Sequence, residues 1–205
     1  MVQRPTPTPE ASIQLETVSA ILINRSRLTE TSLIVHWCSQ EAGLFKTVAK
    51  GALQPKSAFA GRLDLFVTCE VVVARSPKTD LHTLREVHLT NPRLQLRGSY
   101  LRVLSATYFC KLVDLVAEKE TPLGGIHELL RLSLDYLVDH EPSNRLIQRF
   151  ESRLCSELGL GDSQQGAAAL LHDVYHRPLP PQRKRLLEEL GKVPKQDSLG
   201  GSDFA

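Results

Sequence analysis

The chain has 205 residues, 41% of them apolar and 23% charged, which is the composition of an ordinary globular protein. Its 25 lysines and arginines nearly balance 23 acidic residues, so the net charge of +2 excludes a polybasic arm or a nucleic-acid coat. The longest apolar run, residues 167–171, is far shorter than the roughly 20 residues that cross a bilayer, and this excludes a transmembrane role.

The first residues and the cysteines indicate a cytoplasmic protein. Residues 1–14 hold three prolines and lack the apolar stretch of a secretion signal, so we expect a flexible lead there. The cysteines form no CxxC pair and lie in apolar stretches, at Cys38, Cys69, Cys110 and Cys155. We predict four buried, inert thiols, although a fold that gathered them would make a metal site.

The pattern in residues 15–90 predicts β-strands, because β-branched and alternating apolar residues recur between turn-forming residues. The predicted strands are 18–24, 31–39, 44–51, 65–75 and 82–90. A longer connection, 52–64, separates the third strand from the fourth. Five short strands with a long link after the third favour a Greek-key barrel of the OB type, and an SH3-like barrel is the nearest alternative.

After Pro92 the apolar residues recur at three- and four-residue steps, which predicts helices. The expected helices are 99–118, 126–139, 143–159, 166–175 and 181–190, with Ser143 as a helix cap. The first three should pack as a bundle, because none can bury its apolar stripe alone. The predicted fold class is therefore α+β with two domains, a five-stranded OB barrel at 15–90 and an all-α helical domain at 91–190, followed by a flexible tail at 191–205.

Motifs of catalysis are missing from the sequence. There is no GxxxxGK[ST] loop for phosphates, no GxGxxG after a strand, no GxSxG elbow and no HExxH. His172 and His176 are four residues apart, as two metal ligands on a helix would be, but no third ligand accompanies them. Two solvated histidines are the simpler interpretation, and we predict neither an enzyme nor a cofactor or metal site.

Lysines and arginines of the barrel give the strongest functional signal. Residues 42–63 hold four cations and no carboxylate. OB barrels bind oligonucleotides with strands two and three and with the loops after strands one and four, and cations are expected at all these places. The candidate DNA-binding residues are Arg25, Arg27, Lys46, Lys50, Lys56, Arg62 and Lys78.

Their expected positions follow from the strand pattern. Arg25 and Arg27 should lie in the loop after the first strand, Lys78 in the loop after the fourth, and Lys46 and Lys50 on one face of the third strand. The same cations would also suit the solvated outside of a small barrel. The aromatic residues Trp37, Phe45, Phe59 and Phe66 would either stack on bases or, more simply, fill the core.

Short motifs also carry a family resemblance. They are Glu30–Ile34, Gly43-Leu44, Val48–Ala52, Pro55–Ser57, Leu84–Glu86 and, in the third helix, Arg149–Glu151. Over about residues 15–160 the chain resembles the RecO family of bacterial DNA-repair proteins, in which an OB domain precedes a helical one. The resemblance implies binding of single- and double-stranded DNA in the nucleoid, annealing of complementary strands, and cooperation with RecR and the single-strand-binding protein so that RecA can load.

One departure from the family pattern concerns zinc. Many members carry a four-cysteine zinc module after the third helix, and residues 159–169 of this chain contain no cysteine. The comparison predicts a helical domain without zinc, shortened or remodelled.

An alternative from another functional class is a protein-interaction module. In that case the helical bundle would capture RecR or the acidic tail of the single-strand-binding protein, and the barrel would be a spacer. The basic run Arg183–Arg185 would either extend a DNA path or cap a solvated helix.

Overall fold

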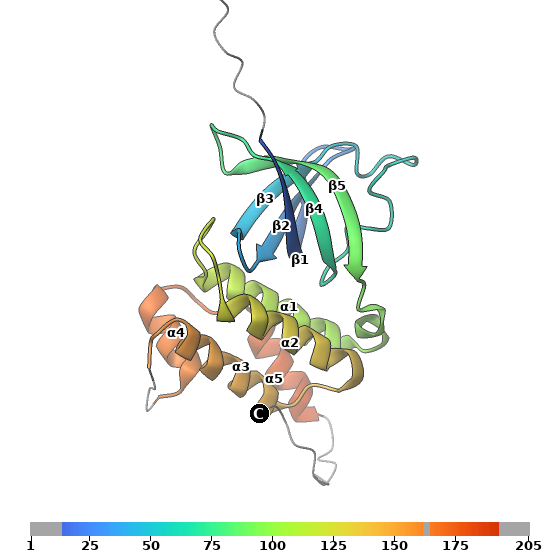
Figure 1. Cartoon of the computed structure of the whole chain (residues 1–205). Coiled ribbons are helices and arrows are strands. Elements are labelled where there is room, and N and C mark those ends of the chain that lie inside the picture. Colours follow the sequence, from blue (N-terminus) through green and yellow to red (C-terminus); the bar gives the residue numbers. More distant parts are fainter. Residues whose placement is uncertain (1–13, 162–164, 193–205) are drawn as a thin grey trace, which may run out of the picture. The chain divides into compact units, whose positions relative to one another are not determined.

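The computed structural model describes residues 14–161 and 165–192, so nearly all of the expected lead and most of the expected tail lie outside the described residues. The chain forms two compact units (Figure 1). Of the described residues, one unit holds 14–92 together with Ala117–His127, and the other holds Arg93–Val116, 128–161 and 165–192. Residues 117–127, which the sequence pattern places in the helical domain, therefore group with the barrel.

The first unit is a closed five-stranded barrel, as the sequence pattern predicts. Its strands are β1 (Leu15–Arg27), β2 (Leu33–Ser39), β3 (Gly43–Ala49), β4 (Thr68–Ala74) and β5 (Leu81–Asn91). They follow one another around the barrel in the order β1-β2-β3-β5-β4, and β4 returns to pair with β1. All pairs are antiparallel except β3 with β5, which is the arrangement of an OB fold.

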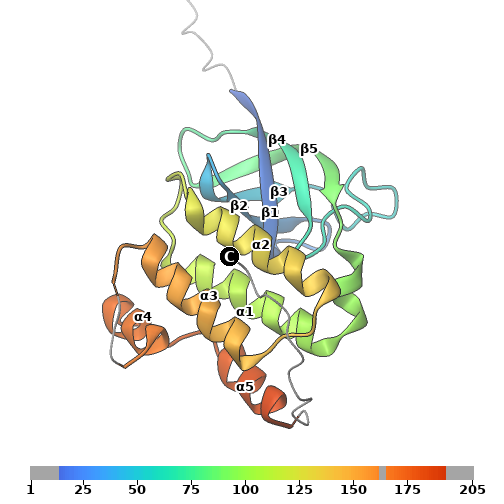
Figure 2. The ribbon, with the colours of Figure 1, turned by 60° about the horizontal axis from the view of Figure 1, so that its bottom comes forward.

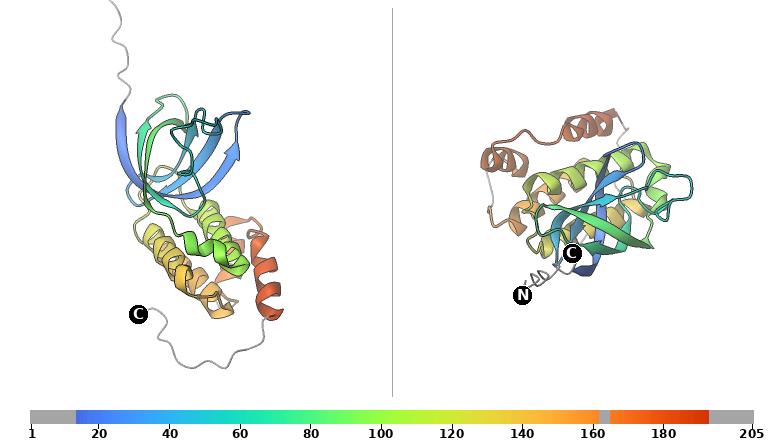
Figure 3. Two further views of the ribbon diagram at one scale, coloured as in Figure 1. Left: turned by 90° about the vertical axis from the view of Figure 1, so that its right-hand side faces the viewer. Right: turned by 90° about the horizontal axis from the view of Figure 1, so that it is seen from above.

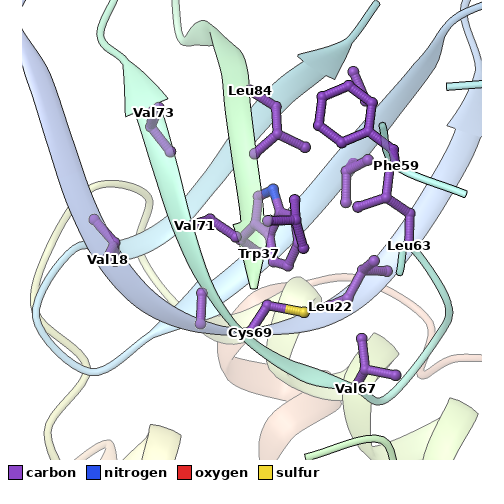
Figure 4. Close-up of a cluster of buried hydrophobic side chains, with 14 of the residues drawn as sticks. Val18, Leu22, Trp37, Phe59, Leu63, Val67, Cys69, Val71, Val73 and Leu84 are labelled. Atoms are coloured by element: carbon purple, nitrogen blue, oxygen red, sulfur yellow. The ribbon is translucent and has the colours of Figure 1, made fainter. Parts of the chain in front are cut away.

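The barrel interior is filled by apolar side chains from every strand (Figure 4). Trp37 lies at its centre with no exposed surface, and its indole N–H donates to the Thr47 hydroxyl over 2.8 Å, so the one polar atom of the indole ring is satisfied. The segment between β3 and β4 contributes Phe59 and Leu63 to the same core, and this segment closes one end of the barrel.

The connection at residues 117–127 completes the edge of β3. Its Glu120 amide donates to the Leu44 carbonyl over 2.9 Å, and the Leu123 amide donates to the Gln40 carbonyl over 3.0 Å. Gly43 lies against the backbone of this connection and has φ at 71°. A Cβ on Gly43 would lie 2.6 Å from the amide nitrogen of Thr121. A glycine is therefore required by both the backbone conformation and the close approach of the connection.

The described residues of the second unit form five helices, close to the five predicted. They are α1 (Tyr100–Val116), α2 (Gly125–Asp139), α3 (Asn144–Glu157), α4 (Ala167–Tyr175) and α5 (Gln182–Lys192), with a short 3-10 helix at Leu94–Gly98. Only the first turn of α2 groups with the barrel. The predicted cap is confirmed, because the Ser143 hydroxyl accepts from the Leu146 amide at 3.1 Å. Figures 2 and 3 show the helices from two sides; α4 packs on α3 and α5 packs on α1. Among the described helices, none has both the length and the apolar character that a bilayer span requires.

A buried carboxylate joins three of these helices. Glu151 of α3 is only 2% exposed and accepts from the Tyr108 hydroxyl of α1 over 2.6 Å and from Arg183 Nε of α5 over 2.7 Å. Burial and the neighbouring carboxylate raise the pKa of Tyr108 far above its usual range, so its hydroxyl stays protonated and donates. Beside them Phe150 stacks on Phe109, with ring centroids 4.0 Å apart. The motif Arg149–Glu151 thus supplies two residues of the helical core.

The close approach at Gly43 predicts a stability difference between two glycine variants. Gly61 has the same φ of 71° but nothing near its Cβ position. We expect Gly43→Ala to lower the free energy of unfolding by about 3 kcal/mol and Gly61→Ala by about 1 kcal/mol, since both strain the backbone and only Gly43→Ala pushes the connection away. Urea unfolding of both variants checks this, and equal losses would show that the connection does not press on β3.

The Glu151 cluster predicts a second stability effect. Glu151→Ala leaves the buried Tyr108 hydroxyl and the guanidinium of Arg183 without their acceptor, and we expect a loss of about 3 kcal/mol in the free energy of unfolding. Gln148 is exposed in the middle of the same helix, so Gln148→Ala should change stability by less than about 0.5 kcal/mol. The comparison is made by urea or thermal unfolding, and similar losses in the two variants would contradict the structural role of the carboxylate.

Candidate nucleic-acid interface

Lys46 occupies the centre of the predicted binding face. It pairs with His36 of β2 on one side and with Leu81 of β5 on the other. Its neighbours in β3, Phe45 and Thr47, point into the barrel and are buried, so Lys46 points outwards by strand alternation. This is the outer surface of β2 and β3, where OB folds bind oligonucleotides.

Arg25 and Arg27 lie in β1, not in the loop that follows, so their predicted location is wrong. β1 continues to Arg27 because a bulge at Ile23 lets the strand bend and stay paired with β2. Arg27 pairs with Leu33, which in turn pairs with Ala49 of β3. Two strand spacings therefore place Arg27 about 10 Å from the end of β3.

Lys50 follows β3 in a turn, so the expectation that it shares a strand face with Lys46 is also wrong. Gly51, with φ at 69°, turns the chain away from the barrel, and its amide donates to the Ser32 hydroxyl over 3.4 Å. The turn keeps Lys50 exposed at the same end of the barrel as Arg27. These two residues therefore come together through the turn and not through strand alternation.

The seven candidates fall into two groups. Lys46 and Lys78 lie near the beginning of β5, whereas the others surround the end of the barrel that the segment 50–64 closes. The loop that holds Lys78 and the segment 50–64 lie on opposite sides of the barrel in Figures 1 and 2. Arg62 belongs to the second group, because it donates to the Val87 carbonyl over 3.0 Å, beyond the middle of β5 and away from its beginning.

The candidates also differ in their partners. Arg25 donates to the Leu63 carbonyl and lies 3.5 Å from Asp64, so part of its charge is balanced. Arg62 is held by its hydrogen bond to the Val87 carbonyl. Within the described part of the chain, the other five form neither an ion pair nor a side-chain hydrogen bond, namely Arg27, Lys46, Lys50, Lys56 and Lys78. These five side chains can attract a polyanion without first breaking a contact.

Arg75 lies near Lys78 in the chain, but its contacts hold it against the barrel. Its guanidinium donates to Glu16 over 2.7 Å and lies 4.9 Å from the centre of the Phe45 ring. It therefore covers the end of the barrel opposite the segment 50–64. His82 fills the same end; its Nδ1 accepts from the Ser76 amide at 3.1 Å, so Nε2 carries the hydrogen and donates to Glu120 at 2.7 Å.

The aromatic residues considered as stacking surfaces belong to the core. All four are at most 9% exposed, at Trp37, Phe45, Phe59 and Phe66. Stacking of bases on these rings therefore gives no support to the candidate interface on the outer surface of β2 and β3, which consists of charged side chains.

Neither the cysteines nor the histidine pair forms a metal site among the described residues. The four cysteines are buried, as predicted, and form no disulfide, and burial raises the pKa of the Cys69 thiol to about 11. α4 ends at Tyr175, and His176 caps it in a left-handed conformation, so His172 and His176 do not share a helical face.

The basic run in α5 is only partly available. Arg183 is held by Glu151, and the Arg185 guanidinium lies 5.3 Å from the centre of the Tyr100 ring. Lys184 is exposed. The first and last residues of the run thus stabilise the helical unit.

A groove between α2 and α3 was not anticipated from the sequence. It is about 30 Å³ in volume and lined by apolar Leu129, Leu132, Leu146 and Phe150, with Arg149 and Arg153 at its side. On α3 the arginines recur every four residues, at Arg145, Arg149 and Arg153. That spacing places them on one face of the helix and is the signal by which the sequence could have indicated this surface.

A closed five-stranded OB barrel with unpaired lysines on its outer surface, followed in the chain by a five-helix unit, defines a two-domain OB-fold protein. The family model described as "Recombination protein O N terminal" matches residues 13–93, and "Recombination protein O C terminal" matches residues 97–165. The chain belongs to the RecO family of DNA repair proteins.

Individual relatives agree with this assignment. The chain is 32% identical over 153 residues to the DNA repair protein RecO of Symbiobacterium thermophilum, covering 73% of this chain and 58% of the relative. It is 30% identical over 140 residues to the protein of the same name in Aliivibrio salmonicida, covering 68% and 57%. With that of Burkholderia orbicola it shares 29% over 169 residues, covering 82% and 57%. The matched part of the chain thus spans somewhat more than half the length of these relatives.

Proposed function

We propose that this chain is a non-catalytic recombination mediator that binds single- and double-stranded DNA in the cytoplasm, at the nucleoid, and anneals complementary strands. The observation that carries the proposal is the unpaired Lys46 on the outer surface of β3, with further unpaired cations at both ends of that surface. Neutralised phosphates release counterions, which favours binding without any contact to base edges.

Annealing follows from the same surface. Two DNA strands repel each other through their phosphates, and a cationic surface that contacts both lowers that repulsion so that complementary bases can pair. Family membership further supports cooperation with RecR and the single-strand-binding protein, so that RecA loads at gaps and breaks. This role requires no bond to be made or broken by the protein.

The proposal predicts a change in the salt dependence of binding. Lys46→Gln combined with Lys50→Gln removes two phosphate contacts, so the slope of log affinity against log salt for single-stranded DNA should fall by about 1.4. The control is Lys111→Gln with Lys192→Gln, which removes the same formal charge from exposed lysines of α1 and α5, outside the barrel. Fluorescence anisotropy with a labelled oligonucleotide measures both slopes. Equal slopes in the two double variants would show that Lys46 and Lys50 do not contact the DNA.

The groove between α2 and α3 favours a second function, capture of the acidic tail of the single-strand-binding protein. A hydrophobic side chain of the tail would lie across its apolar lining, while Arg149 and Arg153 would attract the carboxylates. The barrel could then act as a spacer, and DNA binding by this chain would be weak.

This second function predicts a difference between two arginines of α3. Arg153 lines the groove, whereas Arg145 lies on the same helix face outside it. We expect Arg153→Glu to weaken binding of a fluorescent tail peptide about tenfold and Arg145→Glu to weaken it less than threefold, because charge effects fall with distance and salt. Titration of both variants with the fluorescent peptide measures the two affinities. Equal weakening would show that the peptide responds to the overall charge of the helix and not to the groove.

A further inference from the structure

A small pocket opens at the end of the barrel that the segment 50–64 closes. Its volume is about 120 Å³, and its apolar walls come from Leu33, Leu53, Phe59 and Leu63. Two charged side chains, Arg25 and Asp64, also line it, and small residues, Ala60 among them, make up the rest. Figure 4 shows Phe59 and Leu63 extending from this segment into the core, so the floor of the pocket is the barrel core itself.

The polar side of the pocket is held in place. Arg25 donates to the Leu63 carbonyl and pairs with Asp64, whose Oδ1 accepts from the Leu65 amide at 2.8 Å. The Leu53 amide donates to the Thr31 carbonyl over 2.9 Å, which fixes the opposite wall to the loop between β1 and β2. The pocket therefore presents a donor and an acceptor side by side in a fixed geometry, next to apolar walls.

The chemistry of the lining excludes a phosphate. A phosphate group needs donors alone, and the Asp64 carboxylate would repel it. A neutral heterocycle with both donors and acceptors on its edge suits a lining that combines a guanidinium, a carboxylate and apolar walls. The cations Arg27, Lys50 and Lys56 belong to the same end of the barrel and are exposed, so phosphates have sites outside the pocket.

We infer that this pocket receives one unstacked nucleobase of bound single-stranded DNA; the inference rests on the proposed DNA binding and adds a base site to it. The Arg25 guanidinium faces acceptors on the base edge, and the Asp64 carboxylate faces its N–H groups. A base in a duplex is stacked and paired and cannot enter. The pocket thus gives the protein a preference for single strands that charge alone does not provide.

A substitution that fills the pocket without changing the charge of the protein tests this inference. Ala60 lines the pocket and is exposed, whereas Ala58 is exposed in the same segment outside it. We expect Ala60→Leu to weaken binding of a labelled single strand of about 12 nucleotides roughly tenfold, the effect of losing one base contact, and to leave duplex binding unchanged. Ala58→Leu should bind both DNAs like the unchanged protein.

A second measurement uses the unchanged protein and does not depend on how the variants fold. Oligonucleotides with one abasic site at successive positions should show a loss of about tenfold at one position or a short run, and Ala60→Leu should bind all of them alike. Equal binding of the single strand by Ala60→Leu and Ala58→Leu, or no loss at any abasic position, would overturn the base site. If the unchanged protein binds neither single strands nor duplexes, the proposed DNA binding is wrong. The pocket then has no nucleobase to receive, and the base site is wrong as well.

Discussion

The barrel depends on a short parallel pairing between β3 and β5. Only three residue pairs make it, Lys46 with Leu81, Thr47 with His82 and Val48 with Thr83. Without this pairing the five strands would form an open sheet with two free edges. Closure also fixes the candidate interface, because Lys46 belongs to the pairing and the loop that holds Lys78 leads directly into β5. The fold and the candidate interface therefore share their central residue.

Closing the sheet leaves the barrel's ends and the remaining edge of β3 to be covered, and segments between the strands and helices do this. The segment 50–64 places Phe59 and Leu63 in the core at one end, and Arg75 with His82 and Glu120 covers the other. The connection 117–127 covers the part of β3 that β5 does not reach. The segment 50–64 also forms one wall of the pocket beside Arg25, so the same residues stabilise the barrel and shape a candidate binding site.

Periodicity was sufficient to predict the order of strands and helices, because each element buries one face and repeats its apolar residues accordingly. It was not sufficient for the positions of Arg25, Arg27 and Lys50. A bulge extends β1 through polar residues, and a glycine turn ends β3 early; neither changes the apolar pattern that marks a strand. The burial of Glu151 also could not be predicted from the apolar pattern, because its partners Tyr108 and Arg183 are 43 and 32 residues away in the sequence. Contacts between distant segments are set by packing and not by local spacing.

The small net charge conceals an uneven distribution of ion pairs. In the helical unit several arginines are held by carboxylates: Arg93 by Asp135, Arg102 by Glu141, Arg131 by Glu128 and Arg183 by Glu151. On the barrel, Arg27, Lys46 and Lys50 have no such partner within the described residues. Paired charges contribute little to the field at a distance, whereas unpaired ones attract phosphates over about a Debye length, near 8 Å at physiological salt. A chain of net charge +2 can therefore present a cationic surface where its lysines and arginines have no carboxylate partner.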